Sequence, residues 1–127
     1  MLRQFLLAIP FIDGGAGSTV EFMSGTRPIP MDRVDFTVAH ALAGQYLGMK
    51  LIYLEAGSGA KQPVSSALIE AVKNVIDVPL IIGGGIKTPE VAEKAVRAGA
   101  SIIVTGTIIE NDLNLTKELA DAVHWRK

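Results

Sequence analysis

The sequence lacks cysteine altogether, has few aromatic residues (6%) and carries no long block of one charge. Without cysteine there is no disulfide framework, and nothing marks a secreted protein. Twelve basic and thirteen acidic residues leave a net charge of −1, so the basic stripe of a nucleic-acid surface is missing and no nucleic acid is expected as a partner. The longest apolar run, residues 5–12, falls far short of the ~18 residues of a membrane span and makes a poor signal peptide. These absences predict a soluble cytoplasmic protein.

The 127 residues that are present suit one globular domain, with 49% apolar and 20% charged residues. Residues 50–55, 78–83 and 100–106 are short, nearly continuous apolar runs rich in isoleucine and valine. Strands buried on both faces have this composition, and they belong to parallel sheets covered by helices.

Helical patterns alternate with these strands, at residues 32–48, 65–76, 88–100 and 114–123. The third has Thr88 as its expected N-cap, Pro89 at the first helical position and Gly99 as its stop. The alternation predicts an α/β fold with parallel strands and right-handed connections. Before residue 30 the pattern weakens. One more strand is expected somewhere in residues 5–23, within 18–23 or within 5–12, where Pro10 interrupts the run.

Glycines follow each of the three clear strands, at Gly57 and Gly59, at 83–85 and at Gly106. Turns alone often require glycine. However, all of these glycines fall at the carboxyl ends of strands, where parallel α/β folds bind ligands. The stretch "GGGIKTPE" then opens a helix, whose N-terminus attracts anions. A phosphate site is therefore favoured over ordinary turns.

The stretch "YLEAGSGA" (53–60) places a phenol and a carboxylate where a core strand runs into a glycine loop. Glu55 could be a proton acceptor in a site or a structural ion-pair partner. Tyr53 could contact a ligand or be a core aromatic residue with a satisfied hydroxyl. The residues alone leave both alternatives open.

Together with "PLIIGGGIKTPE" and "AGASIIVTGTIIE", this stretch resembles the geranylgeranylglyceryl phosphate synthase family, whose bacterial relatives make heptaprenylglyceryl phosphate. The spacing of the three blocks matches, as does "RPIP" followed by a helix, and the resemblance runs from about Gly17 to the end. Residues 1–16 match poorly. "YLEAGSG" is specific to the family, whereas "GGGI" and "GT" occur in many phosphate-binding barrels.

The resemblance implies a (β/α)8 barrel that transfers a geranylgeranyl group from its diphosphate to the C3 hydroxyl of sn-glycerol 1-phosphate, with Mg²⁺, in archaeal ether phospholipid biosynthesis. Glu55 would be the catalytic base that takes the hydroxyl proton, and the Tyr53 hydroxyl would reach the phosphate. The implied residues of the glycerol 1-phosphate site are Tyr53, Leu54, Glu55, Ala56, Gly57, Ser58, Gly59, Gly84, Gly85, Gly106 and Thr107.

The length departs from the family, because a complete barrel takes ~250 residues. Residues 1–127 would form a single partial domain, the C-terminal half of the barrel with about four βα units. The family's magnesium ligands have no counterpart here, so no metal ligand is assigned and the activity of this chain alone is doubtful. Half a barrel exposes two sheet edges and an apolar inner face, which predicts self-association or a homo-oligomer. The alternatives are another phosphate-binding barrel enzyme or a non-catalytic half-barrel.

Overall fold

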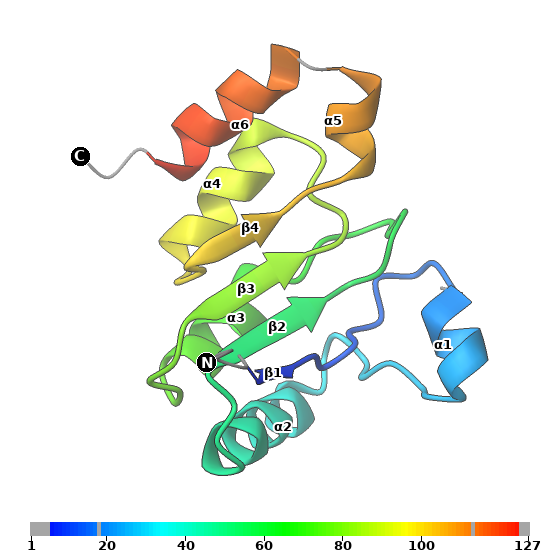
Figure 1. Ribbon diagram of the computed structural model, residues 1–127, viewed down its shortest axis with the longest axis vertical. Helices are drawn as coiled ribbons and strands as arrows, with labels where there is room; N and C mark the ends of the chain where they lie inside the picture. Colours follow the sequence, from blue (N-terminus) through cyan, green and yellow to red (C-terminus); the bar gives the residue numbers. More distant parts are fainter. Residues whose placement is uncertain (1–5, 18, 113, 125–127) are drawn as a thin grey trace, which may run out of the picture.

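The computed structural model describes residues 6–17, 19–112 and 114–124, and its centre is a sheet of four parallel strands in the order β1-β2-β3-β4 (Figure 1). The strands are β1 (Leu7–Ala8), β2 (Leu51–Glu55), β3 (Leu80–Gly83) and β4 (Ile102–Val104). The predicted α/β fold with parallel strands is confirmed. Each strand is shorter than its apolar run, because the residues next to it turn into loops.

Within the described residues, six helices connect and follow the strands: α1 (Thr19–Ser24), α2 (Val34–Tyr46), α3 (Ser66–Lys73), α4 (Pro89–Arg97), α5 (Thr107–Asn111) and α6 (Asn114–Val123). Helix α2 packs on β1 and β2, α4 packs on β4, and α3 lies between α2 and α4. In Figure 1, α3 passes behind β2 and β3, while the face of the sheet toward the viewer carries no helix. The helices therefore cover one face of the sheet.

The two faces follow from the alternation of side chains along each strand. Ile52 and Leu54 of β2 are fully buried against the helices, whereas Tyr53 and Glu55, which alternate with them, lie on the uncovered face and are only partly buried. The core between sheet and helices is aliphatic. Its largest fully buried side chains are Ile12, Ile52, Leu54, Leu68, Ile69, Leu80, Ile82, Val72 and Thr37.

Helix α4 begins and ends as its sequence predicts. The Thr88 side chain accepts a hydrogen bond from the Val91 N–H at 3.4 Å, and Pro89 occupies the first turn, where its missing N–H has no partner to lose. Gly99 follows the helix with a φ of +120°, a conformation that other residues rarely adopt. Helix α4 therefore begins shortly after the glycine loop that follows β3 in the sequence.

The expected strand at residues 18–23 is wrong: residues 19–24 form helix α1, and residue 18 lies outside the described residues. The expected strand within 5–12 exists instead as β1, which ends before Pro10. Beyond β1 the free edge is occupied by Ile29, whose N–H donates to the Phe11 carbonyl and whose carbonyl accepts from the Asp13 N–H. Because Ile29 already occupies that sheet edge, residues 19–24 do not pair with the sheet. Hydrogen bonds within helix α1 satisfy their backbone groups instead.

The strand register brings the ends of three strands into one row. Glu55 of β2 lies beside Gly83 of β3, and Gly83 lies beside Val104 of β4. Because the strands are parallel, the loops that follow them all leave from the same edge of the sheet. In the described part of the chain, no helix is long and apolar enough to cross a membrane.

Candidate functional site

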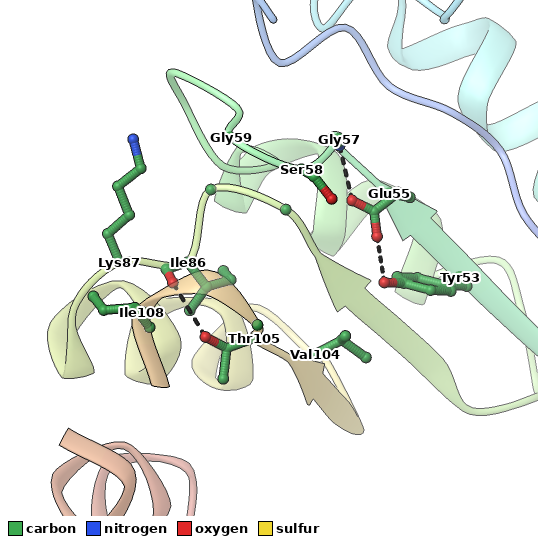
Figure 2. Close-up of a pocket in the computed structure, with 13 residues that line it drawn as sticks. Tyr53, Glu55, Gly57, Ser58, Gly59, Ile86, Lys87, Val104, Thr105 and Ile108 are labelled. Atoms are coloured by element: carbon green, nitrogen blue, oxygen red, sulfur yellow. Dashed lines mark hydrogen bonds between the residues drawn. The ribbon is translucent and has the colours of Figure 1, made fainter. Parts of the chain in front are cut away.

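A pocket lies at the carboxyl ends of β2, β3 and β4, on the uncovered side of the sheet (Figure 2). It is lined by Tyr53, Glu55, Gly57, Ser58, Gly59, Gly84, Gly85, Ile86, Lys87, Val104, Thr105, Gly106 and Ile108. The structure thus brings together eight of the residues expected at the site, from strand β2 and from the loops that follow β2, β3 and β4.

The Glu55 carboxylate accepts hydrogen bonds at both of its oxygens. The Tyr53 hydroxyl donates to Oε2, and the backbone N–H of Gly57 donates to Oε1 at 2.8 Å (Figure 2). Burial, together with the bond to Glu55, raises the pKa of Tyr53 well above its usual range, so this phenol stays protonated and remains a donor. The carboxylate is held in one orientation at the rim of the pocket.

This geometry bears on the expected contact between Tyr53 and the phosphate. A phenol has one proton to donate, and that proton is engaged by Glu55. A phosphate dianion offers only acceptors, so the Tyr53 hydroxyl could reach it only by leaving Glu55. In the arrangement seen here, Tyr53 orients the carboxylate.

The glycine loop after β3 packs closely against this carboxylate. Gly84 has a φ of +81°, and a Cβ on it would lie 2.7 Å from Glu55 Oε1 and 2.7 Å from the Gly57 nitrogen. A side chain here would push the carboxylate aside or force the two loops apart. Glycine at 84 is therefore required by backbone conformation and by packing, whether or not a ligand binds.

Gly106, after β4, is different. Its φ is −125°, and a Cβ built on it meets no heavy atom within 4 Å. Neither a left-handed backbone nor a close neighbour requires glycine at this position. A side chain at 106 would enter open space, and Gly106 itself lines the pocket.

Two of the expected site residues, Leu54 and Ala56, do not line the pocket with their side chains. Leu54 is fully buried on the helix-covered face, because alternate residues of a strand point to opposite sides. Ala56 is 1% exposed, and its N–H donates to the Gly83 carbonyl at 3.0 Å. Thr107 is the first residue of α5, but its side chain lies outside the described residues.

Sequence reasoning missed five residues that line the pocket: Ile86, Lys87, Val104, Thr105 and Ile108. Thr105 donates to the Ile86 carbonyl at 3.5 Å and so joins the loops after β3 and β4. Lys87 lies across the pocket from Glu55 and adds a positive charge (Figure 2). The position of Lys87 immediately ahead of a helix N-terminus is a sequence signal that could have identified it.

The residues present do not suit a Mg²⁺ ion, which prefers carboxylate and other oxygen ligands. Within the described residues, no cluster of three or more His, Asp or Glu side chains could hold a metal. Among the described residues that line the pocket, Glu55 supplies the one carboxylate, which is too few oxygen ligands for a magnesium site. No chemical step here is assigned to the metal.

Solved structures that share this fold are barrels, and this chain superposes on one part of each. The wild-type geranylgeranylglyceryl phosphate synthase from Thermoplasma volcanium superposes with a TM-score of 0.87 at 36% identity, over 97% of this chain and 50% of that one. The Thermoplasma acidophilum (S)-3-O-geranylgeranylglyceryl phosphate synthase, solved in complex with its substrate sn-glycerol-1-phosphate, gives 0.84 at 40% identity, over 94% of this chain and 47% of that one. The described fold is thus that of half a barrel.

Curated relatives agree. The chain is 48% identical over 113 residues to the geranylgeranylglyceryl phosphate synthase of Chitinophaga pinensis, which is 89% of this chain and 45% of the relative. It is 62% identical over 94 residues to that of Thermococcus kodakarensis, which is 74% of this chain and 37% of the relative. The chain thus spans about half the length of the relatives that it matches. The family model of the PcrB family matches residues 5–124, and the chain belongs to the PcrB family.

Proposed function

We propose that the pocket binds sn-glycerol 1-phosphate, with the phosphate at Gly84, Gly85 and Gly106 and the glycerol hydroxyls toward Glu55. The observation that carries this proposal is the pairing of an oriented carboxylate with an open glycine position at the ends of neighbouring strands. The relative from Thermoplasma acidophilum, with sn-glycerol-1-phosphate bound, supports the choice of ligand. Lys87 adds a positive charge for the phosphate.

In a complete barrel, this half of the site would take part in prenyl transfer. The C3 hydroxyl of glycerol 1-phosphate attacks C1 of geranylgeranyl diphosphate, a C–O ether bond forms, and the bond from C1 to the diphosphate oxygen breaks. The hydroxyl proton passes to the Glu55 carboxylate, which acts as general base. The product is the ether-linked intermediate of archaeal phospholipid synthesis.

The Glu55 carboxylate suits this role because it is fixed before the substrate arrives. Tyr53 and Gly57 hold one oxygen each, and each oxygen keeps a further lone pair for the substrate hydroxyl. Little reorganisation is then needed when the proton moves. A cytoplasmic location is part of the same proposal, as is a requirement of the complete barrel for Mg²⁺, whose ligands are not among the residues of this chain. Both derive from the sequence and its family.

A titration of the isotope-labelled chain with sn-glycerol 1-phosphate, followed by nuclear magnetic resonance, tests the binding step. The amide signals of residues 84–87 and 105–107 should shift and saturate, and inorganic phosphate should move the same signals at higher concentration. Glycerol without phosphate is the matched control and should leave them in place. Shifts confined to other parts of the chain would contradict the proposed site.

A second titration distinguishes a glycerol 1-phosphate site from the site of a different phosphate-binding barrel enzyme. A carboxylate held toward the glycerol hydroxyls gives the site a preference for the backbone of glycerol phosphate over a phosphate ester of different shape. sn-Glycerol 1-phosphate should therefore bind more tightly than a phosphosugar such as ribose 5-phosphate. Equal affinity for both ligands would favour the other class of barrel enzyme.

A further inference from the structure

The uncovered face of the sheet presents apolar side chains to solvent. Leu7 of β1 is 37% exposed, and Ile102 and Val104 of β4 are 45% and 41% exposed. Ile9, just after β1, is 43% exposed. These four residues stand at the two outer edges of the same face, where apolar area of this kind usually marks an interface.

The two outer strands also have free backbone edges. Within the described residues, β1 pairs only with β2, and β4 pairs only with β3. The Ser101 N–H donates to the Leu80 carbonyl at 2.8 Å, so it points toward β3. Successive residues of a strand turn their backbone groups to opposite sides, so the N–H and C=O groups of Ile102 and Val104 point away from the sheet.

The free edge of β1 is limited at one end. Beyond Pro10, Ile29 already bonds to the Phe11 carbonyl and to the Asp13 N–H. The part of this edge that is left for another strand is therefore residues 7–9. The free edge at residues 7–9 and the three-residue strand β4 are equal in length.

We propose that two copies of this chain close into one eight-stranded parallel barrel, with β4 of each copy paired to residues 7–9 of the other. Four parallel strands that superpose on half of a barrel with a TM-score of 0.87 already have the curvature of a barrel wall. A two-fold axis along the barrel keeps all eight strands parallel. It also makes two equivalent contacts, each between the β4 edge of one copy and the β1 edge of the other. The exposed residues of both copies then fill a shared interior.

This arrangement sets the number and position of the pockets. Because the two-fold axis runs along the barrel, the carboxyl ends of all strands lie at the same mouth. The assembly would carry two copies of the pocket around Glu55 and Gly106, which face each other across that mouth. The association depends on the sheet edges and not on what the pocket binds.

Light scattering and sedimentation of the whole chain test the association. The expected species is a stable pair, with twice the 13.5 kDa mass of one chain. Ile102→Lys places a charge in the shared interior and should give a monomer. The control is Leu47→Lys, because Leu47 is 75% exposed at the end of α2 on the helix layer, and this variant should remain a pair. Circular dichroism checks that both variants fold.

The other outcomes overturn the proposal. A folded wild-type monomer at micromolar concentration would show that a second copy does not cover this face. Oligomers that grow with concentration would mean open head-to-tail pairing and not closure. A pair that survives Ile102→Lys but is lost in Leu47→Lys would place the interface on the helices.

A cross-linking experiment does not depend on any variant that disrupts the pair. The chain has no cysteine, so Ile9→Cys and Ile102→Cys each introduce a single thiol. A mixture of the two variants, treated with a short bis-maleimide, should give covalent dimers, whereas each variant alone should give almost none. Equal cross-linking within each separate variant would overturn the two-fold barrel, which keeps identical edges apart.

Discussion

The Tyr53 hydroxyl donates a hydrogen bond to Oε2 of Glu55, two residues further along the same strand. Both side chains lie on the uncovered face of β2, because residues two apart in a strand point to the same side. The Gly57 N–H completes the arrangement by donating to the other carboxylate oxygen. This relationship leads to distinct predictions for the two side chains.

Glu55→Gln should remove the base and keep the fold. The glutamine oxygen can accept from the Gly57 N–H while its NH₂ group donates to the Tyr53 oxygen, so the local bonds survive. In a full-length barrel that joins this chain to the N-terminal part of the Thermococcus kodakarensis relative, turnover should fall by about two to four orders of magnitude.

Melting temperature and turnover should be measured on the same samples. Glu93→Gln is the control, because that carboxylate pairs with Arg97 on the surface of α4, away from the pocket. A Glu55→Gln barrel with wild-type turnover per folded molecule, or one that only melts earlier, would refute a catalytic role for Glu55.

Tyr53→Phe in the same barrel should lower kcat and change the affinity for glycerol phosphate little. The phenol proton is engaged by Glu55, so its loss frees the carboxylate to rotate and leaves the phosphate contacts in place. Steady-state kinetics separate the two effects. A weaker affinity by about 1 kcal/mol with kcat unchanged would instead show that Tyr53 donates to the phosphate.

The raised pKa of Tyr53 predicts an alkaline loss of stability. Its pKa in the folded chain lies above the unfolded value of about 10. Above that pH the unfolded chain releases the phenol proton more readily, so unfolding becomes more favourable as the pH rises. Urea unfolding between about pH 9 and pH 11 should show a steeper loss of stability for the wild type than for Tyr53→Phe.

Tyr46→Phe is the matched control, because the chain has two tyrosines and Tyr46 is 81% exposed. It should follow the wild-type stability curve. Identical curves for the wild type and Tyr53→Phe would contradict the raised pKa of Tyr53.

Two glycine substitutions distinguish packing from ligand contact. Gly84→Ala should lower the melting temperature, because its Cβ would meet Glu55 and Gly57 at 2.7 Å and its φ is positive. Gly106→Ala should keep the melting temperature close to wild type and weaken glycerol phosphate binding, because the Cβ enters open space at the pocket.

Both variants can be compared by thermal unfolding and by calorimetric titration. Inorganic phosphate provides a check with a smaller ligand, and it should also bind less tightly to Gly106→Ala. Undiminished binding of both ligands to Gly106→Ala would place the phosphate elsewhere.

From residue 32 onward, the sequence by itself determined the order of strands and helices, apart from the short helix α5. Residues 80–83 are buried on both faces and form a continuous apolar run, and the cap of α4 at Thr88 is local. Gly57, Gly84 and Gly106 could be predicted to lie together because parallel strands end at the same edge. Local periodicity and the direction of the chain were enough for these inferences.

Only the tertiary structure decided which groups meet. The bond from Tyr53 to Glu55 needs Gly83 of the neighbouring strand, because a side chain there would clash with both groups, and the contact from Thr105 to Ile86 joins two loops. The helix at residues 19–24 replaced an expected strand because Ile29, from a separate segment, occupies the neighbouring edge. Such contacts depend on distances through space between segments, and a pattern read along one chain does not contain them.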